Sequence, residues 1–234
     1  FRDKDRLLHA DHLTYRQNYE HLEVSGGISL QTPELEGILQ SGKMLYDLEA
    51  GRIDLHEQPQ FRRSRSEGTL LIHADSMHID LERQQLAGTG KFRIASPEMD
   101  LYSERGLYNA GKEHLILLAK VVLTQRKEGN NHNQIQADSM IVQLRDGAVE
   151  KVHIPSRMQG SLQSSATRIS GIQGTGSRFF FKDADLERID LESNADLIHK
   201  HLDENTLDHI RGESMSLYFV AGQGLQRIRV QGRA

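Results

Sequence analysis

The sequence predicts an elongated all-β fold of stacked antiparallel strands that repeat along the chain. The first observation is a self-similar unit of about 31 residues, which occurs four times in the first half of the 234 residues. The second is that apolar residues within a unit fall on alternate positions, so their side chains share one face of an extended strand. The third is the abundance of hairpin-turn signals and the scarcity of helical periodicity. Such repeats indicate units that each contact mainly their neighbours.

The repeat unit begins with a large residue and places further members of the same register seven, nine, thirteen and fifteen positions later. The four starting residues are Tyr15, Tyr46, Ile79 and Tyr108. We expect these residues to face the interior of the stack: Leu22, Val24, Ile28, Leu30, Ile53, Leu55, Phe61, Leu86, Phe92, Ile94, Leu115, Leu117, Val121 and Leu123. Pro59 and Gly88 fill the two remaining positions of the register, whereas Glu23 and Gln31 are predicted to face outward.

Each long strand carries a predicted bend near its middle. The eleventh position after the starting residue is Gly26, Glu57, Gly90 or Ala119, which is small in three of the four units. A small residue inside an alternating strand lets the strand bulge or bend. A bend repeated in register would give every layer the same folded profile.

Turn signals separate the strands throughout the chain. Ala50-Gly51 and Ala110-Gly111 predict positive-φ turn positions in the first half. Asp146-Gly147, Asp183-Ala184 and Gly222-Gln223-Gly224 predict tight hairpins in the second half. Hairpins join antiparallel strands, which argues against a right-handed β-helix, whose strands are parallel and whose repeat is roughly 20–29 residues.

The second half repeats with a different spacing. It follows the polar segment Gln125 to Asn133, which we expect to be a loop, and its apolar residues recur after five, eight and ten positions, starting at Leu144, Phe181 and Val220. Because the dipeptide Ala10-Asp11 of the first half recurs as Ala74-Asp75 and Ala137-Asp138, both halves are predicted to belong to one stack. We therefore expect residues 1–234 to form a single domain, with a soft boundary near 126–134.

Composition excludes several classes of function. The hydrophobic share of 37% suits a thin core with much surface. The net charge of -4, from 29 basic and 33 acidic residues, provides no basic field, so no nucleic-acid partner is expected. The chain has no cysteine and no long apolar run. Because it begins at Phe1, we expect a processed or excised form from which any signal peptide or N-terminal anchor has been removed.

Candidate metal and phosphate sites are weak. The closest histidine pairs, His9 with His12 and His199 with His201, lack the further ligands that a metal site needs, so we expect no metal. The glycine-rich segment 171–176 lacks the Lys-Ser/Thr of a phosphate-binding loop and is predicted to be a turn. No cofactor is expected.

Candidate catalytic residues are equally weak. Asp183 with Asp185, or Asp75 with Asp80, are the acid pairs that could be considered, but such pairs arise by chance in a chain with 26% charged residues. We therefore predict that the protein is not an enzyme. The densest basic segment, Arg62-Arg63-Ser64-Arg65, is predicted to be a solvated loop between two strands.

The order of these motifs resembles the OstA-like family of lipopolysaccharide-transport proteins. The residues that carry the resemblance are Ala10-Asp11, the alternating strand with Tyr15, the pattern Leu-x-Val-x-Gly-x-Ile-x-Leu from Leu22 to Leu30, and Gly42 leading to Leu45-Tyr46-Asp47. The resemblance is clear over residues 9–150 and looser over 178–234. It implies an open β-jellyroll in which V-shaped layers of antiparallel strands form a groove for acyl chains.

The same resemblance implies a periplasmic protein that bridges the inner and outer membranes of a Gram-negative cell. The implied partners are lipopolysaccharide or a related glycolipid and other β-jellyroll proteins of the transport machinery. The chain is longer than the short soluble members of the family, and its later repeats have another spacing. It would therefore be a divergent member or the soluble part of a membrane-anchored one.

The inward rows could bind lipid. Burial of each methylene group is worth about 0.8 kcal/mol, and rows aligned from layer to layer would offer many similar weak sites for an acyl chain. The same rows would also form the packed core of any stacked β-fold, and both interpretations stay open here. Two other functions remain: a structural β-solenoid scaffold that assembles through its edge strands, and a β-helical enzyme acting on polysaccharide.

The C-terminal strand is a predicted site of association. Leu225, Ile228 and Val230 alternate with polar residues, and no proline interrupts them. An unprotected edge strand tends to pair with another chain. We expect end-to-end association through this edge, either head-to-tail with a second copy or with a related jellyroll domain.

Overall fold

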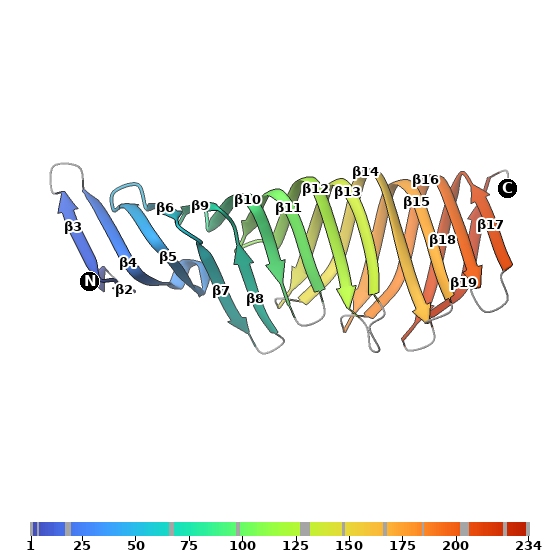
Figure 1. The fold of residues 1–234 in the computed structure, drawn as a ribbon, viewed down its shortest axis with the longest axis horizontal. Helices are drawn as coiled ribbons and strands as arrows, with labels where there is room; N and C mark the ends of the chain where they lie inside the picture. Colours follow the sequence, from blue (N-terminus) through green and yellow to red (C-terminus); the bar gives the residue numbers. More distant parts are fainter. Residues whose placement is uncertain are drawn as a thin grey trace.

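The structure is a computed structural model that describes residues 2–3, 5–16, 20–65, 68–96, 99–126, 132–146, 148–165, 168–183, 185–201, 206–221 and 224–232. Within these ranges it contains nineteen strands and one 3-10 turn, η2 (Pro33–Leu35). The prediction of an elongated all-β jellyroll of stacked antiparallel strands is confirmed. Figure 1 shows the strands lying side by side along the long axis of the molecule.

The strands follow one another in chain order. They are β1 (Arg2–Asp3), β2 (Arg6–His9), β3 (His12–Arg16), β4 (His21–Thr32), β5 (Gly37–Asp47), β6 (Arg52–His56), β7 (Gln60–Arg65), β8 (Gly68–His73), β9 (Ser76–Asp80), β10 (Gln85–Ala95), β11 (Met99–Asn109), β12 (His114–Arg126), β13 (His132–Arg145), β14 (Ala148–Ser165), β15 (Arg168–Lys182), β16 (Asp185–His201), β17 (Thr206–Gly212), β18 (Ser214–Val220) and β19 (Gly224–Gln231). Every ladder between described strands is antiparallel.

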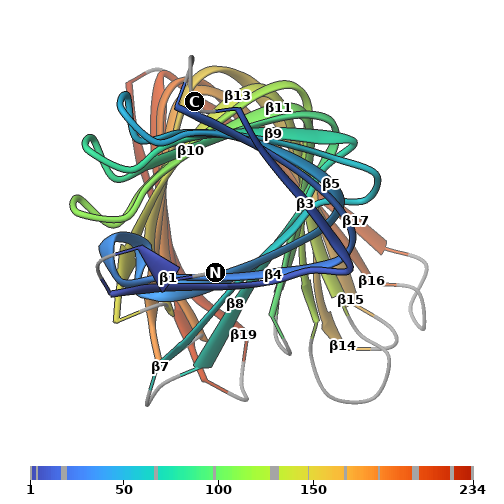
Figure 2. The same cartoon turned by 90° about the vertical axis from the view of Figure 1, so that its left-hand side faces the viewer.

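The sheet folds over into two walls. Wall A contains β3, β6, β9, β18, β19 and one half of each long strand, and wall B contains β2, β7, β8, β17 and the other halves. The long strands pass from one wall to the other along a line that we call the corner. The hairpin turns lie on the opposite side, which we call the mouth. Figure 2 shows the walls surrounding a common interior.

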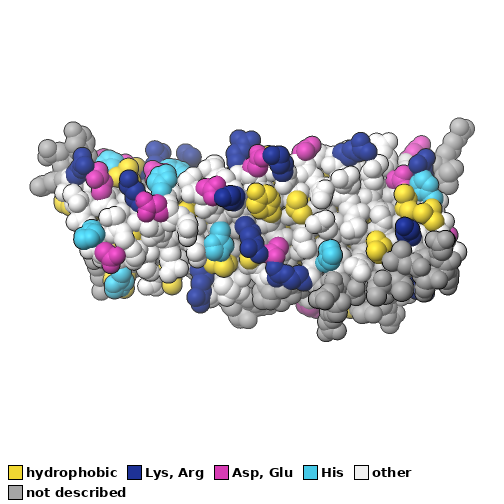
Figure 3. Space-filling model, in the orientation of Figure 1, with side chains coloured by type: hydrophobic (Ala, Val, Ile, Leu, Met, Phe, Trp, Pro, Cys, Tyr) yellow, Lys and Arg dark blue, Asp and Glu magenta, His cyan; other side chains and the backbone are white. Residues whose placement is uncertain are grey.

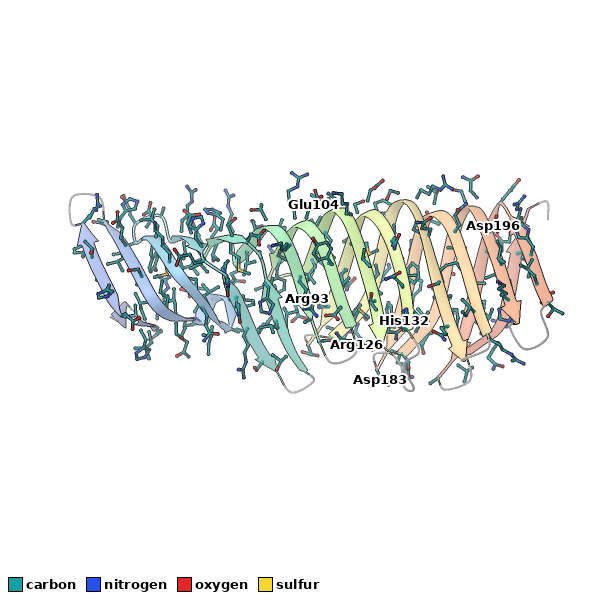
Figure 4. All side chains as sticks on the ribbon, in the orientation of Figure 1. Arg93, Glu104, Arg126, His132, Asp183 and Asp196 are labelled. Carbon is teal, nitrogen blue, oxygen red and sulfur yellow. The ribbon has the colours of Figure 1, made fainter. Side chains whose placement is uncertain are left out.

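The predicted bends form the corner. Gly26, Glu57, Gly90 and Ala119 all have positive φ, at 74°, 63°, 70° and 64°. The strand register shifts between Ser25 and Ile28, between Thr89 and Phe92 and between Leu118 and Val121, as a bulge requires. The prediction of a bend at this position is confirmed. Glu104 lies on the same corner, at the upper edge of the ribbon in Figure 4.

The corner also explains why Ala-Asp recurs. A Cβ added to Gly26 would lie 2.4 Å from Asp11 Oδ2, and one added to Gly90 would lie 2.4 Å from Asp75 Oδ2. The backbone N–H of Asp75 donates to the carbonyl oxygen of Gly90 at 2.8 Å. Asp11 and Asp75 thus each pack over a glycine of a neighbouring strand, whereas the third copy, Asp138, lies opposite Ala119 at the corner.

Three local predictions are wrong. Gly51 has the expected positive φ of 63°, but in the 110–113 turn the positive φ of 51° falls on Glu113 rather than on Gly111. Arg62 to Arg65 belong to β7 and do not form a loop. The glycine-rich segment 171–176 lies inside β15, where Gly176, with φ of 66°, takes part in the corner instead of a turn.

The later repeats continue the same stack. β13 pairs with β14, β15 with β16, and β18 with β19, as the hairpin signals predict, and Asp146 and Asp183 have φ of 53° and 51°. Gly147, Ala184, Gly222 and Gln223 lie outside the described residues. So do 127–131 of the predicted polar loop, while its flanks belong to β12 and β13. These two strands pair from His114↔Gln143 to Arg126↔His132. The backbone pairing therefore joins the segments on either side of the soft boundary expected near 126–134. The single domain over 1–234 stays a prediction.

Candidate functional site

The predicted lipid-facing residues all lie in the interior. Their exposed fractions range from 0% to 4%, and they belong to one cluster of buried apolar side chains that extends from Leu8 in β2 to Leu217 in β18. The residues concerned are Leu22, Val24, Ile28, Leu30, Ile53, Leu55, Phe61, Leu86, Phe92, Ile94, Leu115, Leu117, Val121 and Leu123. They contact protein rather than solvent, and whether lipid can reach them remains a prediction.

Cross-strand pairing aligns these residues in rows along the molecule. In wall A one row runs through Leu22, Tyr46, Ile53, Ile79, Leu86, Tyr108, Leu115 and Val142. In wall B a facing row runs through Leu30, Leu39, Phe61, Ile72, Ile94, Leu101, Leu123 and Ile135. Adjacent members of a row are separated by one strand spacing, about 4.8 Å. The interior thus offers hydrocarbon in a regular array.

Aromatic rings fill space that glycines leave free. A Cβ on Gly106 would lie 2.1 Å from Phe92 Cε1, and one on Gly88 would lie 2.4 Å from Phe92 Cδ2. Phe61 occupies the space beside Gly37 in the same way, with a hypothetical Cβ 2.3 Å from its Cε2. Gly88 therefore belongs to the inward register as predicted, and its missing side chain accommodates a ring.

Two arginines cross the interior at the mouth, and we call them the wall-crossing arginines. Arg63 of wall B is only 3% exposed, donates from Nη1 to the hydroxyl of Tyr108 in wall A, and donates from Nη2 to Glu36 Oε2 at 2.6 Å. Glu113 Oε1 lies 3.5 Å from the same Nη1. Charge-assisted hydrogen bonds of this kind are roughly twice as strong as neutral ones. They hold the two walls together.

Arg6 makes the second crossing. It donates from Nε to Glu34 Oε1 at 2.9 Å and from Nη1 to the hydroxyl of Tyr46 in wall A. Sequence analysis missed both arginines, and it placed Arg63 in a loop. The alternation of Phe61 and Arg63 on one strand face was the signal that could have placed Arg63 inward.

Farther along the mouth, neutral polar residues replace the arginines. The buried amide of Asn133 donates from Nδ2 to Gln125 Oε1 at 2.8 Å, and its Oδ1 accepts the backbone N–H of Gln163 at 3.0 Å. Ser170 Oγ lies 2.7 Å from His199 Nδ1. These hydrogen bonds join neighbouring strands within wall B, where they satisfy buried polar groups.

Both ends of the stack leave apolar positions uncovered. In β3 the inward Leu13 and Tyr15 are 42% and 51% exposed. In β19 the predicted association residues Leu225, Ile228 and Val230 are half-buried, and Ile228 pairs with Leu217 while Val230 pairs with Met215. Repeat stacks usually cap such ends with polar residues. Association through β19 stays a prediction.

The outer surface is mainly polar. Figure 3 shows small groups of apolar side chains between charged ones on the face in view. Burial, followed by the charge of Arg93, lowers the pKa of His73 on wall B. On the corner, a hydrogen bond from Lys120 lowers the pKa of the Glu104 carboxyl and raises that of the Lys120 amine.

The acid pairs considered for catalysis lie at strand ends, and Asp183 and Asp185, which flank the connection between β15 and β16, are both exposed. Asp75 and Asp80 lie at opposite ends of β9, where they are ion-paired with Lys91 and Arg83 at 3.9 Å and 3.7 Å. Among the described residues no group of three or more His, Cys, Asp or Glu could hold a metal ion. No helix in the described part of the chain is long and apolar enough to span a membrane.

Comparisons with known proteins found a likeness in fold. No family model matches the chain, and no curated protein matches its sequence. Among solved structures, the chain is similar to LptH of Pseudomonas aeruginosa, described as the LptA-homologous periplasmic component of the conserved lipopolysaccharide transport device. The match has 6% sequence identity and a TM-score of 0.41, and it covers 45% of this chain and 76% of that one.

Proposed function

We propose that this protein binds lipopolysaccharide or a related glycolipid in the periplasm and forms part of a bridge that carries it between the inner and outer membranes. The observation that supports this function is the uninterrupted apolar interior, whose rows extend from β2 to β18. An acyl chain gains about 0.8 kcal/mol for each methylene it buries. Rows that repeat at every strand spacing, about 4.8 Å, would let a chain move between similar sites.

Lipid binding would require the walls to part. Because the inward side chains are at most 4% exposed, an acyl chain must replace contacts that these side chains make with one another. Replacing contacts between apolar side chains by contacts between side chains and an acyl chain costs little dispersion energy if the packing stays dense. The hydrogen bonds across the mouth, at Tyr46 and Tyr108, would have to open in the same step.

Photo-crosslinking tests the lipid site. A photoreactive residue at inward Phe92 should crosslink to lipopolysaccharide several-fold more than one at the neighbouring Arg93, whose side chain is 52% exposed (Figure 4). A second pair, buried Leu117 and 38% exposed Ile116, repeats the comparison in a site without a large ring. Phe92→Asp should abolish binding, provided that the variant folds. Equal crosslinking from the inward and outward members of both pairs would contradict the proposal.

We also propose that the ends of the stack pair with other β-jellyroll proteins of the machinery or head-to-tail with a second copy. The support is the pair of unpaired edges at β3 and β19 and the uncovered apolar residues beside them. Analytical ultracentrifugation across a concentration series should show association that Ile228→Pro abolishes, because proline removes a backbone donor. A natural chain that stays monomeric and binds no jellyroll partner would refute this part.

A structural scaffold that assembles through its edges is the alternative function. The observation that favours it is the fully packed interior. Association without any lipid crosslinking would support it over the conduit. The β-helical enzyme is set aside, because every described ladder is antiparallel, whereas a β-helix has parallel strands.

A further inference from the structure

The outer face of wall A carries a row of alternating cations and aromatic rings near the C-terminal end. Cross-strand partners place Lys151, Phe180, Arg188, Tyr218 and Arg227 side by side on β14, β15, β16, β18 and β19. We call this row the cation–aromatic ladder. The Arg188 guanidinium lies 4.0 Å and the Lys151 amine 5.4 Å from the centre of the Phe180 ring, and Arg227 lies 4.2 Å from that of Tyr218.

The ladder presents positive charge at regular intervals. Its cations lie on every second strand, so neighbouring charges are about 9–10 Å apart. Stacking on a ring fixes the plane of a guanidinium while its N–H edges stay able to donate. Among the described residues, neither Lys151 nor Arg227 has a carboxylate within ion-pair distance. These donors are therefore available to an anionic ligand.

A polar pocket adjoins the ladder on the same face. Arg178, Asp190, Ser216 and Arg229 pair across the strands two residues closer to the corner than the ladder. Together with Ser214 they line a pocket of about 170 Å³. Glu192 and Gln231 also line the pocket, which thus combines two guanidinium groups, two hydroxyls, two carboxylates and an amide beside the ladder.

The mixture of donors and acceptors distinguishes this surface from a simple basic patch. Arg188 is ion-paired with Asp190 at 3.2 Å, and Arg178 is ion-paired with Glu192. The carboxylates in this surface can accept hydrogen bonds from sugar hydroxyls, which the phosphates of a membrane surface do not offer. The whole chain carries a net charge of -4, so attraction of polyanions must depend on this local arrangement.

We propose that the ladder and its pocket form a binding site for a linear acidic oligosaccharide. Guanidinium groups bind sugar carboxylates in bidentate fashion, and the pocket hydroxyls bind the hydroxyls of one residue of the chain. The site lies on the outside of wall A, so it does not depend on lipid entering the interior.

Isothermal titration calorimetry of the full chain tests this site. The acidic probe is tetragalacturonate, and the neutral probe is maltotetraose. The acidic oligosaccharide should bind, its affinity should fall as salt rises, and the neutral one should bind at least tenfold more weakly. The double variant Arg227→Gln, Arg229→Gln should lose at least tenfold in affinity. The matched double variant Arg62→Gln, Arg105→Gln, which removes the same charge from exposed positions elsewhere, should change affinity less than twofold.

Two further variants separate recognition from folding and from general charge. Lys151 lies on β14, inside the stack rather than at its edge, and Lys151→Gln should lower the affinity for tetragalacturonate about threefold. Ser216→Val leaves the charge unchanged and should also lower this affinity about threefold. Equal losses in the two double variants, absence of tetragalacturonate binding, or binding of anionic vesicles (3:1 phosphatidylcholine:phosphatidylglycerol) in place of the oligosaccharide would each overturn the proposal.

Discussion

The first part of the stack, β2 to β9, and the second part, β10 to β19, differ in how their strands pass the corner. In the first part only β4 and β5 run through it, and the other strands end there in separate pairs. In the second part β10 to β16 all run through it as strands of 11 to 18 residues. Pro59, which lacks an amide donor and follows two residues of positive φ, accounts for one of the breaks.

The two parts also differ in the polar groups buried at the mouth. The first part supplies the charged guanidinium groups of Arg6 and Arg63, which bond across the mouth to Tyr46 of the same part and to Tyr108 of β11 in the second part. The second part buries Gln125, Asn133 and Ser170, whose hydrogen bonds stay within wall B. The apolar rows are continuous through both parts. We infer that the second part needs less energy to open its mouth, because these hydrogen bonds within wall B, unlike those of Arg6 and Arg63, do not have to break when the walls part.

The largest expected effect comes from the shared core. Phe92→Ala should lower the free energy of unfolding by about 3–5 kcal/mol, because it removes a fully buried ring and leaves a cavity. Denaturant titration measures this value. Phe180→Ala, on the outer face of the second part, is the control and should cost less than half as much. Similar losses would show that inward packing does not dominate stability.

Loss of a wall-crossing bond should have the next largest effect. Tyr108→Phe removes the hydroxyl that accepts from the buried Arg63, leaves Glu113 at 3.5 Å as its remaining contact on the wall A side, and should lower the free energy of unfolding by about 1–3 kcal/mol. Tyr102→Phe removes the same hydroxyl from an outward, 40% exposed side chain and should cost less than about 0.5 kcal/mol. The difference between the two variants in thermal or chemical unfolding isolates the crossing. If the two losses match, the bond between Arg63 and Tyr108 does not hold the walls together.

The corner predicts effects of opposite sign at two equivalent positions. Ala119→Gly should stabilise the protein by up to about 1 kcal/mol, because alanine at φ of 64° is strained in the left-handed region. Gly90→Ala should destabilise it, because the new Cβ would lie 2.4 Å from Asp75 Oδ2. Comparison of the two melting temperatures checks the signs. Two changes in the same direction would mean that the bend does not impose this conformation.

The smallest effect concerns pH. Since the pKa of His73 is lowered in the folded state by burial and by Arg93, the unfolded chain binds more protons just below pH 6.5. Stability should therefore fall as pH drops from about 6.5 through the folded pKa. His73→Gln should remove this part of the pH dependence, and Arg93→Gln should reduce it only in part because burial remains. A pH profile of unfolding that His73→Gln leaves unchanged would contradict this.

The sequence by itself determined the strands, the inward rows and the corner, because these depend on residues that are near one another in the chain. Alternation places Leu22 and Phe92 inside whatever the neighbours are, and a left-handed residue at Gly26 or Gly90 bends its own strand. The turn chemistry of Asp146 and Asp183 is local in the same sense.

Only the tertiary structure decided which distant side chains meet. Arg63 reaches Tyr108, 45 residues away, because the facing walls are offset along the stack. Five strands must align before Lys151, Phe180 and Arg227 become neighbours in one ladder. Alternation tells which face a side chain lies on, but not its partner on another strand. That partner depends on the register and stagger of the assembled sheet, to which residues from every layer contribute.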